Sequence, residues 1–419
     1  KVTSPLHPDR PAMETKRQDG RFHPDTFVYE PLSGTGQFGQ CFDTLGNRFV
    51  SSNRHPLMHV VIAPGLLGRN PHYPFTETVE NVVPVAAKVY PLSPDTTAAS
   101  YIPSLINKQH SGTYTSASGI CIRGRDAFIC EPAQNLVQRQ VLTPTGATFT
   151  AEHPSPGRDF LSTPDQWFRP VHTTVGPDGS LYICDMVRQY IDHPRYLPED
   201  IRTKLPFKAG THHGRIWRVI LEDPVPSKPN AAQQAAARRN LQIRQGNFPK
   251  VTKQTLLKQT RSKNANTRFL ASLQLAGQNH EDKTSALANM LSANSNDRWL
   301  RASIFNATGD AAIDLLDQLA YSSRRAHGDT LKSLGRIIGK GRSQQELLGI
   351  LRRHLGAEAP WPTNSQIVLL TGLAEGIQGR KFNGPVKSNI LVMPMGHPKA
   401  LANTDMVFSA ARKSALVEN

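Results

Sequence analysis

Apolar and polar residues alternate in short runs through the first half of the chain, a pattern typical of half-buried β-strands. Two segments share one design, an apolar strand, a tight turn and a second strand: GQCFDTLGNRFVSSN from Gly39 and TTVGPDGSLYICDM from Thr173. The pairs Gly46-Asn47 and Asp178-Gly179 supply the positive φ angles that tight turns require. The first half is therefore expected to be all-β and built from repeated hairpins.

Further strands are predicted near residues 119–122, 127–130 and 136–142, and a closing strand is predicted over 213–220. Repeated hairpins of this kind are typical of propeller blades, of which a closed propeller has four to eight. Only three or four are recognisable here. Residues 1–222 are therefore expected to form a partial β-propeller whose other blades lie upstream of the sequence.

The pattern changes after EDPVPSKPN, which begins at Glu222 and carries three prolines in nine residues. Proline disfavours both helix and strand, so residues 223–230 are predicted to be a linker. From 231 to 380 the apolar spacing is helical, and the string at Arg268–Ser272 recurs at Trp299–Ser303, 31 residues later. This repeat predicts an α-helical solenoid of the HEAT kind, followed by a C-terminal extension over 381–419.

Charge is distributed unevenly between these two parts. Residues 1–223 hold 22 Lys and Arg against 21 Asp and Glu, a net charge of +1, whereas residues 224–419 hold 27 against 12, a net charge of +15. The basic pairs of the helical part are Arg238-Arg239, Arg324-Arg325, Arg352-Arg353 and Arg380-Lys381. With little aromatic interleaving and no recognised binding motif in this half, they favour an acidic protein partner or a solvated surface over nucleic acid.

The four cysteines, Cys41, Cys121, Cys130 and Cys184, include no CxxC pair for a metal and no CxxCH for haem attachment. They are expected to be buried thiols, with a disulfide as the alternative. The sequence has no apolar run long enough to span a bilayer and no signal-peptide pattern, so no transmembrane segment is predicted.

Several longer strings occur in one order: SGTGQFGQCFDTLGNRFVSSN from Ser33, CEPAQNLVQRQVL from Cys130, WFRPVHTTVGPDGSLYICDM from Trp167 and IDHPRYLPEDIR from Ile191. With HHGRIWRV from His212, they resemble planctomycete-type membrane-bound dehydrogenases, in which a glucose/sorbosone dehydrogenase-like propeller precedes HEAT-like repeats. The resemblance implies a periplasmic or otherwise extracytoplasmic quinoprotein-type oxidoreductase. It would oxidise a sugar or other alcohol and pass electrons to a cytochrome c.

The same resemblance implies pyrroloquinoline quinone and calcium as cofactors, because related sugar dehydrogenases hold them over the propeller axis. Arg169 keeps the first arginine of the Arg-x-Arg pair of those enzymes, whereas Val171 stands at the second. Their cofactor-binding lysine has no counterpart near Ala133 or Gln134. These departures favour an alternative, a non-catalytic propeller-solenoid scaffold that binds carbohydrate or protein.

Two arginines are candidate cofactor-binding residues. Arg169 precedes a predicted inner strand and could fork two hydrogen bonds to a carboxylate, or could instead pair with Asp185 or Asp165 to join neighbouring blades. Arg188 follows the strand over 181–184 and could hold an anion. Each of these residues therefore has a structural as well as a functional interpretation.

The candidate catalytic residues are His172 and Asp185. Asp185 could be a base or metal ligand, or an aspartate that caps a turn beside a partner arginine. His172 and His193 lie near the proposed mouth of the propeller, and a histidine pKa near neutrality suits a general base. His55 and His59 have helical metal-ligand spacing, but Pro56 argues against a helix there, and the adjacent His212 and His213 would face opposite sides of a strand.

Overall fold

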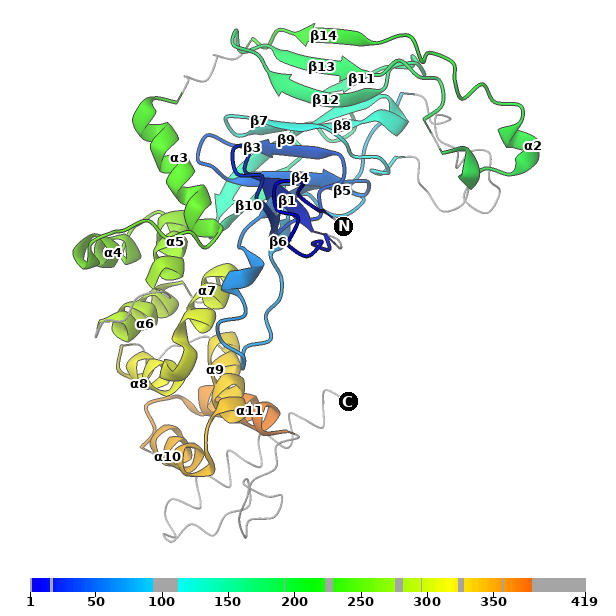
Figure 1. The fold of residues 1–419 in the computed structure, drawn as a ribbon. Helices are drawn as coiled ribbons and strands as arrows, with labels where there is room; N and C mark the ends of the chain where they lie inside the picture. The colour runs from blue at the N-terminus through cyan, green and yellow to red at the C-terminus, as the bar shows by residue number, and fades with distance from the viewer. Residues whose placement is uncertain are drawn as a thin grey trace. The chain divides into compact units, whose positions relative to one another are not determined.

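The computed structural model of the chain describes residues 2–15, 18–92, 112–191, 193–222, 229–275, 282–294, 296–322, 328–355 and 358–378. The chain divides into two compact units. The first unit comprises residues 1–64 and 77–249, and the second comprises residues 65–76 and 250–419. Strands dominate the first unit and helices the second, which confirms the predicted change from a sheet-rich to a helical half (Figure 1).

The strands of the first unit form four antiparallel sheets, ordered β1-β2, β3-β4-β5-β6, β10-β9-β8-β7 with β11 paired to β9, and β12-β13-β14. Within the described residues none of these sheets closes on itself. The strands are β1 (Asp19–Phe22), β2 (Tyr29–Leu32), β3 (Gly39–Phe42), β4 (Arg48–Ser52), β5 (His55–Val60), β6 (Val79–Asn81), β7 (Ile120–Arg123), β8 (Asp126–Glu131), β9 (Leu136–Thr145), β10 (Thr148–Glu152), β11 (Leu161–Ser162), β12 (Pro170–Val175), β13 (Leu181–Asp185) and β14 (Arg215–Val219). The strands predicted over 119–122, 127–130, 136–142 and 213–220 are thus confirmed.

Three of the sheets lie against one another, because β7 contacts both β3 and β12 (Figure 1). A Cβ atom on Gly39 would lie 2.2 Å from the carbonyl oxygen of Ser118, and one on Gly119 would lie 2.4 Å from the Cα of His172. The N–H of Gly119 also donates to the carbonyl oxygen of Val171, at 3.0 Å. These sheets approach backbone to backbone, and only glycine leaves room for that.

The turn residues predicted from the sequence adopt the expected backbone conformations. Gly46, between β3 and β4, has φ of 79°, and Gly179, between β12 and β13, has φ of 78°. In β13 the side chains of Leu181, Ile183 and Asp185 are buried and alternate with half-buried neighbours. A carboxylate thus occupies the third inward position of an otherwise apolar row.

Short helical segments and one longer helix complete the first unit. They are η1 (Pro64–Leu66), which continues into the second unit, η3 (Pro132–Gln134), η4 (Pro194–Tyr196), α2 (Glu199–Arg202) and α3 (Ala231–Arg244). Asn230 caps α3 reciprocally with Gln233, at 2.9 and 2.8 Å. At the other end the Arg244 guanidinium is buried and donates to the carbonyl oxygen of Val61, at 2.7 Å.

Because α3 belongs to the first unit, the two units divide between Pro249 and Lys250. The helical part predicted from residue 231 begins with α3, and residues 223–228 of the predicted linker at 223–230 lie outside the described part of the structure. The predicted C-terminal extension over 381–419 and the basic pairs Arg324-Arg325 and Arg380-Lys381 lie outside it as well.

The described part of the second unit holds eight α-helices and one short 3-10 helix. They are α4 (Lys253–Thr260), α5 (Ala265–Leu275), α6 (Lys283–Ala293), α7 (Arg298–Thr308), η5 (Gly309–Ala311), α8 (Ala312–Ser322), α9 (Gly328–Gly341), α10 (Gln344–His354) and α11 (Thr363–Ile377). Side chains cap several of these helices, as when Asp297 accepts from the N–H groups of Trp299 and Leu300 at the start of α7. The helices share one apolar core that includes Leu300, Leu315 and Leu334.

The segment 65–76 leaves the β-rich part of the sequence and packs on this helical core. Tyr73 lies edge to face with Phe305, and Phe75 with Trp299, at ring centroid distances of 5.2 and 5.6 Å. Among the helices described, none is both long enough and apolar enough to cross a membrane.

Candidate functional site

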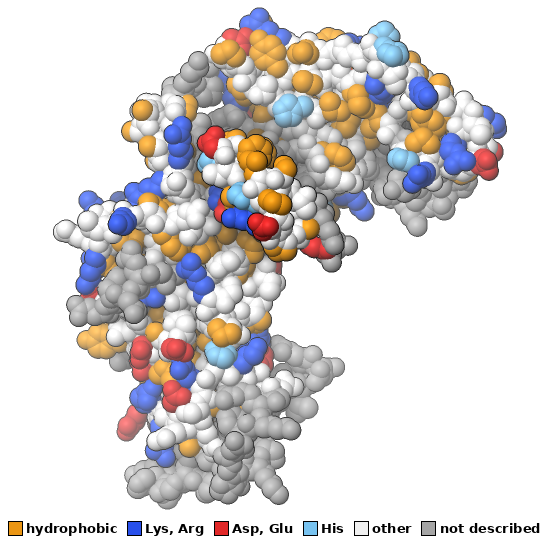
Figure 2. Space-filling view, in the orientation of Figure 1, with side chains coloured by type: hydrophobic (Ala, Val, Ile, Leu, Met, Phe, Trp, Pro, Cys, Tyr) orange, Lys and Arg blue, Asp and Glu red, His pale blue; other side chains and the backbone are white. Residues whose placement is uncertain are grey.

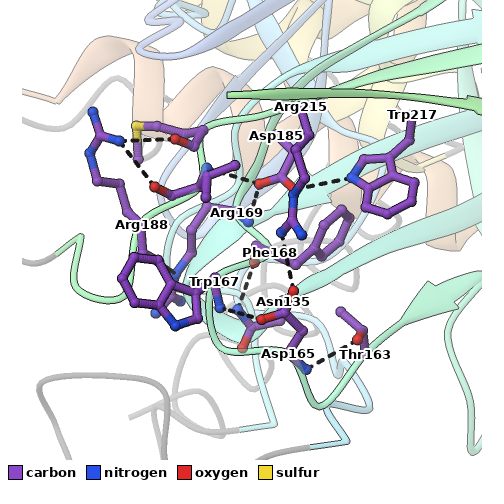
Figure 3. Close-up of polar contacts among 12 residues, drawn as sticks. Asn135, Thr163, Asp165, Trp167, Phe168, Arg169, Asp185, Arg188, Arg215 and Trp217 are labelled. Carbon is purple, nitrogen blue, oxygen red and sulfur yellow. Dashed lines mark hydrogen bonds and ion pairs between the residues drawn. The ribbon is translucent and has the colours of Figure 1, made fainter. Parts of the chain in front are cut away.

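Asp185 ends β13 in the buried row of that strand, and its side chain is 0% exposed. Its Oδ1 accepts hydrogen bonds from the backbone N–H groups of Arg169, at 2.8 Å, and Val187, at 3.0 Å. Its Oδ2 accepts from Nε of Arg215, at 2.7 Å, and from Nε1 of Trp217, at 3.0 Å (Figure 3). The four donors occupy the four lone-pair directions of the carboxylate, so Asp185 joins β12, β13 and β14.

Arg215 forms ion pairs with two acidic residues, the buried Asp185 and the more exposed Asp165. Its Nη2 lies 3.1 Å from Oδ2 of Asp165, and its guanidinium lies over the ring of Trp217, 5.3 Å from the centroid. Asp165 in turn accepts a hydrogen bond from the backbone N–H of Trp167, at 2.9 Å. Burial, hydrogen bonds and both carboxylates act on Arg215, and the net effect raises its pKa above the usual value.

Arg169 is 1% exposed, and its guanidinium donates to backbone carbonyl oxygens. Nε reaches Arg188 at 2.8 Å, and Nη1 reaches Pro132 at 2.8 Å and Ala133 at 3.0 Å. Nη2 donates to the carbonyl oxygen of Gln189. Arg169 therefore ties the 3-10 turn after β8 to the loop after β13, a role that uses the fork of donors of arginine.

Arg188 closes the same loop. Its Nη1 donates to the carbonyl oxygens of Met186, at 3.1 Å, Val187, at 3.0 Å, and Gly210. Val187 and Gly210 have φ of 54° and 86°, so the loop contains two left-handed residues. Such residues are strained when they are not glycine, and the hydrogen bonds of Arg188 offset part of that cost.

His172 lies apart from this cluster of hydrogen bonds. It pairs with Cys184 between β12 and β13, and its side chain is exposed. Among the described residues, it forms no hydrogen bond with Arg169, Asp185 or Arg188. His193 instead caps the turn η4, where its Nδ1 accepts from the N–H of Arg195, at 3.2 Å.

The placement of these residues bears on the cofactors that the resemblance implies. A quinone carboxylate would need exposed N–H groups on Arg169, whose guanidinium is buried among carbonyl oxygens. A calcium ion would need unoccupied oxygens on Asp185, which already accept four hydrogen bonds. Arg169 and Asp185 as arranged here therefore do not fit pyrroloquinoline quinone with calcium. Among the described residues, no group of three or more His, Cys, Asp or Glu is placed to hold a metal ion.

Glu131 is a buried carboxyl group that the sequence reasoning missed. It ends β8, is 0% exposed, and accepts hydrogen bonds from Oγ of Ser116, at 2.7 Å, and from the N–H of Ser116, at 3.0 Å. Thr115 adds a hydroxyl donor at 3.2 Å. Burial raises the pKa of Glu131 to about 7, and the hydrogen bonds from Ser116 and Thr115 oppose that rise. The signal in the sequence was a glutamate at the end of the apolar run AFIC.

The four cysteines, all within the described residues, are free thiols. Burial raises the pKa of Cys121 to about 12 and that of Cys130 well above its usual value. Thiols that are buried and protonated in this way are poor nucleophiles.

Residues 6–223 match the pattern of the family described as "Domain of unknown function (DUF7133)". The match covers just over half of the chain. The chain belongs to this family. No curated protein and no solved structure matches the chain.

The region matched to the DUF7133 family contains His172, Asp185, Arg169 and Arg188, and it also contains Glu131. The helices from α4 onward lie beyond it. The hydrogen-bonded cluster around Asp185 is therefore a feature of the DUF7133 region of this chain.

Proposed function

We propose that the chain is a non-catalytic binding scaffold, a partial β-propeller joined to HEAT-like helical repeats, whose first unit binds carbohydrate. The side-by-side packing of the β3, β7 and β12 sheets supports the propeller, in which the first strands of neighbouring blades approach one another. The 31-residue recurrence at α5 and α7 supports the repeats. Ser272 and Ser303, at equivalent positions of that recurrence, hydrogen bond to each other.

One observation carries the non-catalytic part of the proposal: the polar atoms of Asp185 and Arg169 serve contacts within the chain. A general base needs a lone pair directed at the substrate, and a cofactor clamp needs accessible donors. Asp185 joins β12, β13 and β14 instead, and Arg169 ties the 3-10 turn after β8 to the loop after β13.

The carbohydrate part rests on two exposed indole rings beside the same cluster (Figure 3). Trp167 is 36% exposed and Trp217 is 44% exposed, and the charged pair of Arg215 and Asp165 lies with them. Exposed aromatic rings next to polar groups suit ligands that have both apolar faces and hydroxyl groups.

Intrinsic fluorescence tests this proposal directly, because the other two tryptophans, Trp299 and Trp361, are buried at 1% and 3% exposure. Titration of the full chain with soluble oligosaccharides should change the emission of the exposed pair in a saturable way. Trp167→Ala should remove most of that change, while Tyr321→Ala, at a side chain that is 94% exposed in α8, should preserve it. An unchanged spectrum across the oligosaccharide panel would contradict carbohydrate binding.

The second candidate function is the quinoprotein-type oxidation of a sugar or alcohol, with electrons passed to a cytochrome c in an extracytoplasmic compartment. The exposed imidazole of His172 on β12 favours it, since a general base must reach the substrate. Dye reduction by the full chain supplied with quinone, calcium and a panel of sugars tests this reading. Turnover by the parent chain that is lost in His172→Ala would support this oxidation and contradict the scaffold proposal. Absence of turnover would agree with the scaffold proposal.

A further inference from the structure

A groove of about 580 Å³ opens on the helical unit between α4, the loop after it, α5 and α6. Among the described residues, its lining includes the basic residues Arg261, Lys263 and Arg268 and one acidic residue, Asp282. Three positive charges against one negative give the described lining residues a formal net charge of 3 − 1 = +2. Blue side chains in this region are visible on the face drawn in Figure 2.

The carboxylate of Asp282 already has a cationic partner. Oδ2 of Asp282 lies 2.7 Å from Nζ of Lys253. Asp282 therefore does little to neutralise the arginines and the lysine across the groove.

Arg268 gives the basic loop a defined shape. Its Nη1 donates to the carbonyl oxygens of Ser262, at 2.7 Å, and Lys263, at 3.0 Å, and its Nη2 donates to Oδ1 of Asn294, at 2.6 Å. The loop between α4 and α5 is thereby fixed to the end of α6. Arg261 and Lys263 are exposed on that loop, and neither side chain has an ionic partner in the part of the chain that the structure describes.

Apolar residues also line the groove, with Leu257 from α4 and Ala286 and Met290 from α6, and they lie beside neutral polar residues. None of the described residues that line the groove is aromatic, although stacking on aromatic rings is the usual anchor for single-stranded nucleic acid. Basic and aliphatic residues that line the same groove instead complement a peptide that carries both carboxylates and apolar side chains.

We propose that this groove, bounded by α4, the loop 261–264, α5 and α6, binds an acidic peptide segment of a partner protein. Carboxylates of the peptide pair with Arg261 and Lys263, and an aliphatic side chain lies against Leu257 and Ala286. The proposal concerns the helical unit and is independent of whether the first unit binds carbohydrate or oxidises it.

Fluorescence anisotropy of a labelled peptide of alternating Glu and Leu, titrated with the full chain, tests the proposal. We expect saturable binding that weakens when Gln replaces Glu and also when Ser replaces Leu. An oligothymidylate of matched charge is the nucleic-acid probe and should bind more weakly than the Glu-Leu peptide. Tighter binding of the oligothymidylate, or equal binding of all the peptides, would overturn the proposal.

Two charge-reversed variants separate this groove from general attraction to a basic protein. Arg261→Glu/Lys263→Glu should weaken binding of the Glu-Leu peptide by about tenfold or more, because two exposed attractions become repulsions. Lys340→Glu/Arg352→Glu changes the net charge equally at exposed positions outside the groove and should alter binding by less than about threefold. Equal losses in the two variants would show that the groove is not the binding site.

Discussion

The side-chain amide of Asn70 donates a hydrogen bond to the carbonyl oxygen of Phe305, 2.8 Å away and 235 positions later in the chain. The Oδ1 of the same amide accepts from the N–H of His72, at 3.0 Å. Asn70 is 2% exposed, so both bonds are shielded from water. A segment that leaves the β-rich sequence is in this way made part of the helical unit, and it brings Tyr73 and Phe75 to the core of that unit.

Asn70→Ala should therefore destabilise the helical unit by about 1–3 kcal/mol, since it leaves the buried carbonyl oxygen of Phe305 without its donor. Asn296→Ala, at an exposed position in the loop before α7, is the matched control and should change stability by less than about 0.5 kcal/mol. Urea unfolding followed by circular dichroism at 222 nm measures both. Equal midpoints for the two variants would show that the segment is not required for the stability of the helices.

A second prediction follows from the four hydrogen bonds that the Asp185 carboxylate accepts. Asp185→Asn keeps the shape of the side chain but replaces one acceptor oxygen by an NH₂ group, which faces a donor whichever way the amide turns. We expect a loss of about 2–4 kcal/mol, because a buried ion pair with Arg215 is broken and a donor is left unpaired. Asp165→Asn breaks the exposed half of the same network, at 41% side-chain exposure, and should cost less than about 1 kcal/mol.

The close packing of the sheets makes a third prediction. Gly119→Ala should destabilise the first unit by about 3 kcal/mol or more, because the new methyl group would overlap backbone atoms of Val171 and His172. Gly68→Ala places the same group where nothing lies within 4 Å and should be nearly neutral. Thermal unfolding of the two variants compares them. Similar melting temperatures would mean that β7 and β12 do not meet in solution as they do here.

Much of the fold could be predicted from the sequence because its determinants are local. Strand alternation in β13 and the glycine of the turn before it are decided within a few residues, and the helices after Lys250 follow from apolar spacing. The partners of Asp185 could not be predicted in this way. Arg215 and Trp217 lie 30 and 32 positions away on β14, and they meet the carboxylate only when β13 and β14 pair.

The role of Arg169 was hidden from the sequence for a different reason. Its acceptors are backbone carbonyl oxygens of Pro132, Ala133, Arg188 and Gln189, and a carbonyl oxygen carries no residue identity. Residue types in a sequence indicate only side-chain partners, so the predicted partners of Arg169 were carboxylates. Asp185 does contact Arg169, but through the backbone N–H of the arginine.

Glu131 provides a pH prediction. Its pKa of about 7 in the folded state exceeds the ordinary value of 4.5, so the folded state holds this proton more tightly than the unfolded state does. The associated stability is fully present below pH 4.5 and is lost as the pH rises to about 7, with a total of about 3 kcal/mol. Glu131→Gln should make the free energy of unfolding, measured with urea, decrease less between pH 4.5 and 8. Glu152→Gln, at an exposed glutamate of β10, should leave this decrease unchanged.

His59 should give the opposite dependence. Its ring is buried between Phe49 and Phe149, with Nδ1 2.9 Å from Oγ1 of Thr148, and burial lowers its pKa well below 6.5, helped by the nearby charge of Arg244. The unfolded state is therefore protonated first as the pH falls. The stability contributed by the neutral ring is present above pH 6.5 and declines as the pH falls below it.

His59→Leu removes this titration while keeping an apolar side chain of similar size in the strand. We expect it to cost about 1 kcal/mol at pH 8, where the bond to Thr148 is lost, and to lose less stability than the parent chain between pH 6.5 and 5. His55→Leu, on the same strand at a half-buried position, is the control. If the two variants have parallel stability curves over this pH range, the imidazole of His59 is not kept neutral by its surroundings.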